Sequence, residues 1–243
     1  CYYFGVIWAF IQPVITVLLY WFVFEFGLHQ KVNDLRTGIE VPFVLWLMGG
    51  LVPWFYFQEA LNGGTGVLDE YSYLVKKVVF QIDALPVVKL ISALFTHAFF
   101  VVFMLVVFAV MGFYPDLYVL QIVYYSFCMV ILTAGLIYAT SAVTVFFRDM
   151  KEVVAILLQI GMWVTPIMWN FESMQGIPKW AVVLLKLNPM YYIVSGYRDA
   201  LINKTAFWEH PGLTLWFWGI TLFTLWAGTT VFKRLRVHFA DVL

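Results

Sequence analysis

Residues Leu117–Phe147 read LYVLQIVYYSFCMVILTAGLIYATSAVTVFF and contain no Asp, Glu, Lys or Arg. Roughly 20 apolar residues carry a helix across the hydrocarbon core of a bilayer, so this run is long enough to span it. A spanning helix satisfies its backbone hydrogen bonds internally, and the run lacks the alternating pattern of an outer-membrane strand. The stretch therefore predicts a transmembrane helix.

On either side of this stretch, five further charge-poor windows each predict a transmembrane helix. The six expected spans cover approximately residues 4–27, 42–67, 89–113, 118–147, 152–170 and 211–232. The expected fold class is an all-α integral membrane protein, with residues 1–243 forming a single transmembrane domain. Because the chain opens on Cys1 without a secretory signal, we expect a native N-terminal segment to precede it.

Two stretches between the spans have a different character. Residues 69–88 begin polar and become amphipathic, which predicts a cytoplasmic helix after the second span. Its lysines could meet lipid headgroups, or the helix could dock a soluble motor. Residues 171–209, on the outer side, hold apolar stretches too short to cross, and these predict re-entrant or interfacial helices. Asn188-Pro189 should end one of them and begin the next, placing Tyr191 and Tyr192 near the outer mouth.

Composition excludes several classes of protein. Hydrophobic residues make up 63% of the chain and charged residues 12%, against about a quarter charged in soluble proteins. Fourteen basic residues balance fourteen acidic ones, so nothing favours nucleic acid as a partner. With two cysteines, one inside an apolar run, neither a disulfide framework nor a cysteine metal site is expected.

The distribution of basic residues favours both termini in the cytoplasm, because cytoplasmic loops carry more Lys and Arg. With six spans, the cytoplasmic side then holds Lys76, Lys77, Lys89, Arg148, Lys151, Lys233, Arg234 and Arg236.

No catalytic or nucleotide-binding motif is present. The glycine run Gly63-Gly64-Thr65-Gly66 lacks the lysine of a phosphate-binding loop. No hydrolase or metal-ligand spacing appears either, so we expect no catalytic residue, no metal and no cofactor on this chain. His97 lies inside the third span, where an ionisable residue is a functional candidate, although a hydrogen-bonded packing role is the alternative.

Four motifs, in this order, carry a family resemblance over essentially the whole chain. They are LVPWFYFQEALNGGTGVLDEYSYLVKKVVF (Leu51–Phe80), AVTVFFRDMKEV (Ala142–Val153), VTPIMW (Val164–Trp169) and LKLNPMYYIVSGYRDAL (Leu185–Leu201). Together they resemble the permease subunits of type-2 ABC exporters that move O-antigen, capsule or wall teichoic acid precursors. The NPMYYIVSGYRD element is most similar to teichoic acid exporters. A proline usually follows the basic-aromatic element soon, whereas here Gln81 follows Phe80 and the proline is Pro86.

The resemblance implies a permease homodimer in the plasma membrane of a bacterium, bound to two ATPase subunits that hold ATP and Mg²⁺. It implies a lipid-linked polysaccharide or polyol-phosphate polymer as cargo, with wall teichoic acid favoured and O-antigen or capsule next. It assigns contact with the ATPase to Leu74, Lys76, Lys77, Phe80, Asp83, Leu85, Arg148 and Asp149.

Aromatic residues are dense in the predicted spans and suggest a sugar path. Their flat faces can stack on sugar rings, although interfacial anchoring is the simpler role for each one. Arg198 is a candidate phosphate contact, because its planar fork suits phosphate oxygens, or else a salt-bridging residue that holds the re-entrant segment. The candidate path and gate residues are Phe10, Trp46, Trp54, Phe55, Tyr56, Trp163, Trp169, Tyr191, Tyr192 and Arg198.

Three other functions stay open. An exporter of drugs or other small amphiphiles would share the six-span plan, but its pocket would be apolar. A membrane-embedded lipid- or glycan-modifying enzyme would need clustered acids or metal ligands, and mid-span carboxylates are absent. A secondary transporter would need intramembrane charges, of which the sequence offers little beyond His97.

Overall fold

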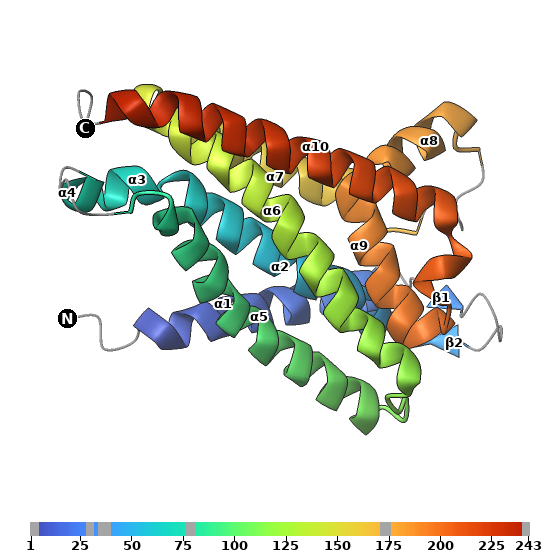
Figure 1. Ribbon diagram of the computed structural model, residues 1–243. Helices are drawn as coiled ribbons and strands as arrows, with labels where there is room; N and C mark the ends of the chain where they lie inside the picture. Colours follow the sequence, from blue (N-terminus) through green and yellow to red (C-terminus); the bar gives the residue numbers. More distant parts are fainter. Residues whose placement is uncertain (1–4, 28–31, 34–39, 76–80, 171–175, 240–243) are drawn as a thin grey trace.

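The computed structural model describes residues 5–27, 32–33, 40–75, 81–170 and 176–239 as a bundle of long helices (Figure 1). A two-residue antiparallel strand pair, β1 (Val32–Asn33) with β2 (Glu40–Val41), lies at one end of the bundle. The helices are α1 (Gly5–Trp21) continued by the π-helix η1 (Phe22–Gly27), α2 (Phe43–Thr65), α3 (Val67–Glu70), α4 (Ser72–Val75), α5 (Ala84–Val110), the 3₁₀ helix η2 (Leu117–Leu120), α6 (Gln121–Phe146), α7 (Met150–Val164), α8 (Lys179–Leu187), α9 (Pro189–Arg198), the π-helix η4 (Asp199–Asn203), the 3₁₀ helix η5 (Phe207–Glu209), α10 (Pro211–Leu235) and the 3₁₀ helix η6 (Arg236–His238).

Helix α2 is the central element of the bundle. It contacts α1, α5, α6, α7 and α9, and most of its side chains are buried. A helix that is apolar on all sides is suited to such a position. Its glycines allow close approach: a Cβ added to Gly64 would lie 2.6 Å from the side chain of Ile137 on α6.

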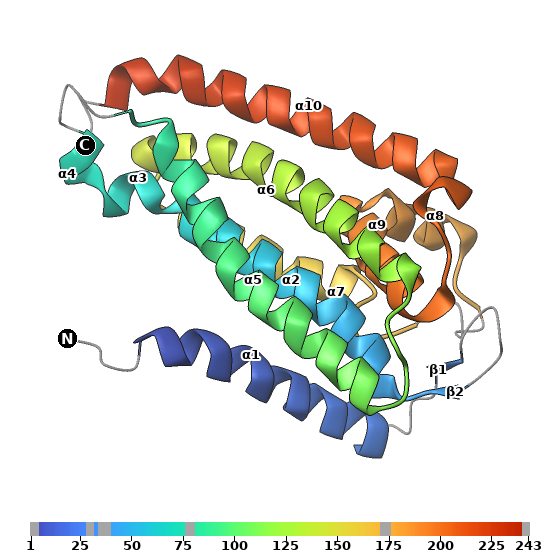
Figure 2. The same cartoon turned by 60° about the horizontal axis from the view of Figure 1, so that its bottom comes forward.

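Helices α6 and α10 run side by side in both views (Figures 1 and 2). Two glycines bring their backbones into contact. A Cβ added to Gly228 would lie 2.0 Å from the carbonyl oxygen of Gly135, and one added to Gly135 would lie 2.7 Å from the Leu225 nitrogen. Small residues permit this packing between membrane helices, where no hydrophobic force drives association.

The predicted break at Asn188-Pro189 is confirmed. The Asn188 side chain accepts a hydrogen bond from the Met190 N–H at 3.0 Å, and Pro189 occupies the first position of α9. The Asn188 amide also donates to the Thr165 hydroxyl at 2.8 Å. This tip of the α8–α9 hairpin is thereby fixed to the chain that follows α7.

Four of the described helical segments are long and apolar enough to cross a membrane: Phe10–Gly27, Ala84–Val110, Leu117–Phe146 and Pro211–His238. Each corresponds to a predicted span. The other two predicted spans correspond to α2, which has 23 residues, and to α7, which has 15. The chain is therefore a mostly helical membrane protein, and the count of six spans stays a prediction.

Two predicted boundaries need correction. The fifth span was expected to reach residue 170, but α7 ends at Val164, because the residue before Pro166 adopts an extended backbone (ψ 127°). Residues 69–88 do not form one helix: α3 and α4 have four residues each. Helix α5 begins at Ala84, so the last five residues of that segment are part of the helix whose span was predicted to begin at residue 89.

Candidate functional site

A polar cleft lies between α1, α2 and α5. Its volume is about 590 Å³, and Met162 of α7 reaches its edge. Most of its polar side chains are amides and hydroxyls. The lining comprises Gln12, Pro13, Thr16, Tyr20, Val52, Phe55, Tyr56, Gln58, Glu59, Asn62, Thr96, His97, Phe100 and Met162.

The polar residues of the cleft were largely missed by sequence reasoning, although a signal was present. Gln12 and Thr16 are four residues apart in α1, and Gln58 and Asn62 are four apart in α2. That spacing places each pair on one helix face. Glu59 lies in α2, and its carboxylate accepts a hydrogen bond from the Thr96 hydroxyl of α5 at 3.4 Å.

His97 links three helices at the wall of the cleft. Its Nε2 lies 2.9 Å from the Tyr197 hydroxyl of α9 and 3.3 Å from the Ser126 hydroxyl of α6. Those two hydroxyls are 2.7 Å apart. The buried imidazole therefore has the hydrogen-bonded packing role that was one of its two expected roles, and it also lines the cleft.

Three of the predicted path aromatics gather at the cleft. Phe55 and Tyr56 line it directly. Phe10 of α1 stacks edge-on against Phe99 of α5 at 4.5 Å and lies 6.2 Å from Phe100, which lines the cleft. Phe55 and Tyr56 therefore face the cleft, and Phe10 packs behind its wall against Phe100.

The other predicted path aromatics lie elsewhere. Trp54 lines a separate, mostly apolar cavity of about 240 Å³ between α2, α6, α7 and α9. Trp163 is 57% exposed on α7, and its carbonyl accepts a hydrogen bond from the Trp169 indole at 2.9 Å. Tyr191 and Tyr192 are buried. They do not share a space with the cleft aromatics.

The Tyr192 side chain is held in place by hydrogen bonds. Its hydroxyl lies 3.1 Å from the Tyr124 hydroxyl of α6 and 3.0 Å from the Thr214 hydroxyl of α10. Its ring also stacks on Phe217 at 4.7 Å. These contacts bind α9 to the ends of α6 and α10, and they hold the side chain in one position.

Arg198, at the end of α9, is 8% exposed and joins three elements. Its two terminal nitrogens donate to the carbonyl oxygens of Pro166 and Ile167, each at 2.7 Å, and its Nε donates to that of Trp46 at 3.3 Å. The guanidinium carbon lies 3.4 Å from the centre of the Trp46 ring, a cation–π contact. These contacts hold the end of α9, as the structural alternative for Arg198 expected, although they run to main-chain carbonyls where that alternative expected acidic partners.

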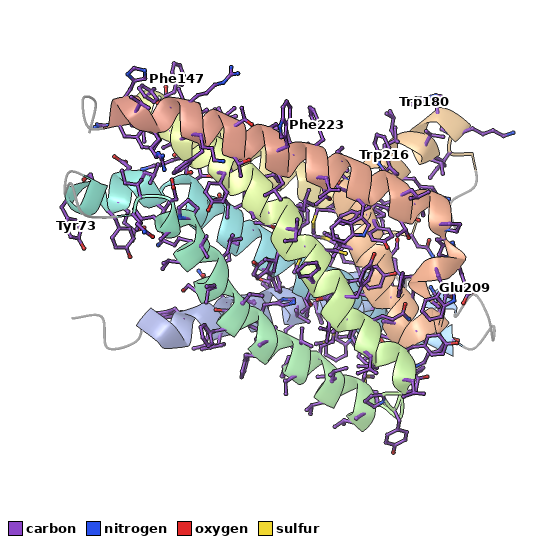
Figure 3. All side chains as sticks on the ribbon, viewed as in Figure 1. Tyr73, Phe147, Trp180, Glu209, Trp216 and Phe223 are labelled. Atoms are coloured by element: carbon purple, nitrogen blue, oxygen red, sulfur yellow. The ribbon has the colours of Figure 1, made fainter. Side chains whose placement is uncertain are left out.

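The end of the bundle that holds α3 and α4 also holds the α6–α7 turn and the end of α10 (Figure 1). Tyr73 and Phe147 project there, 59% and 63% exposed (Figure 3). Arg148 and Asp149 are exposed in the same turn as Phe147. This end therefore offers aromatic and charged side chains to a partner.

Ion pairs tie this end together. Asp83 pairs with Arg236 at 2.5 Å, Lys89 with Glu70 at 2.8 Å and Lys151 with Asp69 at 2.5 Å. Two of the predicted ATPase contacts differ from the exposed Arg148 and Asp149. Asp83 forms its ion pair with Arg236 at the end of α10, and Leu85 is 4% exposed and points into the core. Lys76, Lys77, Phe80 and the side chain of Leu74 lie outside the described residues.

Comparisons with known proteins identify the family. A sequence model described as "ABC-2 type transporter" matches residues 2–202. The chain belongs to the ABC-2 type transporter family. Its relatives include an O-antigen export system permease protein RfbA of Myxococcus xanthus, 25% identical over 237 residues that cover 98% of this chain and 87% of the relative. The RfbA of Klebsiella pneumoniae is also 25% identical, covering 98% and 87%, and the polysialic acid transport protein KpsM of Escherichia coli is 26% identical, covering 94% and 85%.

This membership confirms the resemblance that the four motifs predicted. It agrees with the four described segments that are able to cross a membrane. The individual ATPase contacts and path residues stay predictions, because the match assigns no role to any single side chain.

The Asp69–Lys151 ion pair should make the free energy of unfolding of this ABC-2 chain depend on pH. The hydrogen bond from Lys151 holds the pKa of Asp69 below its ordinary value. A depressed carboxylate pKa stabilises the folded state above the ordinary pKa of Asp, and that stabilisation disappears as pH falls through the folded value. Because both side chains are partly exposed, we expect Asp69→Asn to cost about 0.5–1 kcal/mol at pH 7.

The measurement is the free energy of unfolding of both proteins between pH 7 and pH 3. The difference between wild type and Asp69→Asn should shrink as the pH falls below about 4. A difference that stays constant over this range would show that the ion pair does not stabilise the fold.

Proposed function

We propose that this chain is the permease subunit of an ATP-driven exporter that moves a lipid-linked surface polysaccharide across the bacterial plasma membrane. A second copy of the chain and two ATPase subunits, which hold ATP and Mg²⁺, complete the transporter. The observation that carries the proposal is the cleft lined with amides, hydroxyls and aromatic rings inside an ABC-2 bundle. Such a surface suits hydroxyl-rich sugars.

The proposed topology has six membrane spans, with both ends of the chain in the cytoplasm. The start of α1 and the end of α10 lie at the same end of the bundle as α3 and α4, which supports an even number of crossings (Figure 1). The α8–α9 hairpin enters from the opposite side as a re-entrant element. Its tip at Asn188 contacts Thr165, just past the end of α7.

The relatives favour O-antigen or a capsule-type polysaccharide as cargo, because their names specify O-antigen and polysialic acid. Wall teichoic acid is the second candidate, because the NPMYYIVSGYRD motif at residues 188–199 is similar to that of teichoic acid exporters. A drug or other small amphiphile is the alternative cargo, and the amides and hydroxyls that line the open cleft beside its aromatic rings favour a hydroxyl-rich cargo over it.

The deciding experiment is ATP turnover of the permease–ATPase complex in lipid bilayers, with different precursors added. We expect lipid-linked polysaccharide precursors to stimulate hydrolysis and small amphiphiles to leave it unchanged. Stimulation by amphiphiles alone would replace this proposal with a drug exporter. Failure to form any complex with an ABC ATPase would reject the proposal.

The motor is proposed to act through residues 69–88 and the α6–α7 turn. We expect Asp83→Asn and Phe80→Ala each to lower export by about tenfold or more while ATP hydrolysis continues. The reason is that the movement of the ATPase subunits would no longer be transmitted to α5. Asp83 is suited to this role because it pairs with Arg236 and its carbonyl accepts a hydrogen bond from Tyr138 at 3.0 Å, which joins α5 to α10 and α6. A tenfold change corresponds to about 1.4 kcal/mol of coupling.

Export and hydrolysis are measured together in proteoliposomes. Asp116→Asn is the matched control, because Asp116 pairs with Lys204 at 3.0 Å, away from α3 and α4. The control should retain both activities. Export that survives both Asp83→Asn and Phe80→Ala would remove this segment from the coupling path.

A further inference from the structure

The polar cleft has an unusual charge pattern for a polymer path. Glu59 is the only carboxylate among its lining residues in the described part of the chain, and no Lys or Arg belongs to that lining. The remaining polar groups are amides, hydroxyls and the imidazole of His97. The described lining is therefore neutral to acidic.

Cations on the neighbouring helices do not offset Glu59. Lys89 of α5 pairs with Glu70, and Lys151 of α7 pairs with Asp69, both at the α3 end of the bundle. Arg198 binds main-chain carbonyls of Trp46, Pro166 and Ile167. The described part of α1 carries neither Lys nor Arg.

Glu59 is placed to act on a passing polymer. Its carboxylate is exposed on α2, and Gln58 and Asn62 on the same helix are also exposed. The bond to Thr96 holds it against α5 at 3.4 Å. An exposed carboxylate repels a nearby negative charge through water and salt, so the repulsion is partly screened and depends on ionic strength.

We infer that the cleft selects an uncharged glycan over a polyanionic one, with Glu59 as the residue that rejects negative charge. The inference rests on the proposed function and narrows its substrate class to uncharged glycans, so the polyanions named above as candidates, wall teichoic acid and a capsule like polysialic acid, are excluded. Amides and hydroxyls can donate to and accept from sugar hydroxyls, and Phe55 and Tyr56 add aromatic surface. A phosphate or carboxylate on each repeating unit would meet Glu59 without a cation in the described lining to compensate it. Rejection by like charge is a recognised route to specificity.

The test uses the whole permease–ATPase complex in proteoliposomes with two probes of similar length. One is a polyisoprenoid-linked neutral hexose polymer and the other a polyisoprenoid-linked polyglycerol phosphate. Both carry the same anionic linkage to the lipid, but the polymers differ in sugar rings as well as in charge, so the effect of charge is read from the change that Glu59→Gln makes in the ratio. The readout is the ratio of their export rates.

We expect wild type to export the neutral probe about tenfold faster, and Glu59→Gln to reduce that ratio towards one. Raising the salt concentration should reduce the ratio in wild type but not in the variant, because salt screens charge repulsion. Glu209→Gln is the matched control. It removes a carboxylate on η5, outside the cleft lining, while the amide oxygen can still accept the hydrogen bond from the Ala206 N–H.

Equal export of the two probes by wild type, or a ratio that Glu59→Gln leaves unchanged, would overturn charge selection while leaving the exporter intact. Export of neither probe, with hydrolysis stimulated by small amphiphiles, would overturn both the selection and the proposed function.

Discussion

Replacing Arg198 with Met is expected to lower the free energy of unfolding by about 3–5 kcal/mol, because three buried carbonyl acceptors lose a donor at about 1–3 kcal/mol each. The guanidinium is 8% exposed and donates to the carbonyl oxygens of Pro166, Ile167 and Trp46. Removing it leaves these acceptors without their donor inside the bundle, where water cannot replace it. The end of α9 would then separate from α2 and from the chain after α7.

Detergent-titration unfolding in bicelles measures this loss, and two variants serve as controls. Arg198→Lys keeps the charge but not the planar fork that reaches two carbonyls at once, so it should recover only part of the stability. Arg148→Met removes an exposed arginine and should change stability by no more than about 0.5 kcal/mol. If Arg198→Met unfolds like wild type, Arg198 does not hold the hairpin, and its alternative role as a phosphate contact gains support.

The partners of Arg198 could not be predicted from the sequence. Its chemistry marked it as important, and both a phosphate contact and a structural role were open. Its partners lie at Trp46 and at Pro166–Ile167, far away in the chain. No local pattern specifies such a contact, because the contact depends on how α2, α7 and α9 pack.

The spans were predictable because hydropathy is a property of each segment by itself. The windows at 89–113 and 118–147 agree with α5 and with η2 plus α6 to within a few residues. Hydropathy did not distinguish α2, which is buried in the bundle, from helices that face lipid. The premature end of α7 was signalled by Pro166, but the apolar composition continues past it.

The cleft was partly predictable. Phe55 and Tyr56 were singled out for their aromatic rings, and both line it. The amides at Gln12, Gln58 and Asn62 were overlooked, because single polar residues in an apolar window do not change its average. Their four-residue spacing was visible, but only the packing of α1 against α2 shows that the two polar faces meet.

Gly228→Ala is expected to destabilise the bundle by about 2 kcal/mol, because one methyl group must fit where two helix backbones touch. The added Cβ would lie 2.0 Å from the Gly135 carbonyl oxygen, and a backbone atom cannot rotate away. Overpacking of this kind costs about 1–3 kcal/mol, and the higher helix propensity of Ala offsets at most about 1 kcal/mol of it.

The matched control for this prediction lies on the same helix. A Cβ added to Gly219 of α10 would meet no atom within 4 Å, so Gly219→Ala should keep or slightly raise the free energy of unfolding. The two variants make the same chemical change and differ only in what surrounds it. If Gly228→Ala is as stable as Gly219→Ala, α6 and α10 do not approach as closely as this contact requires. If only Gly228→Ala is destabilised, the glycine contact holds α10 in the bundle.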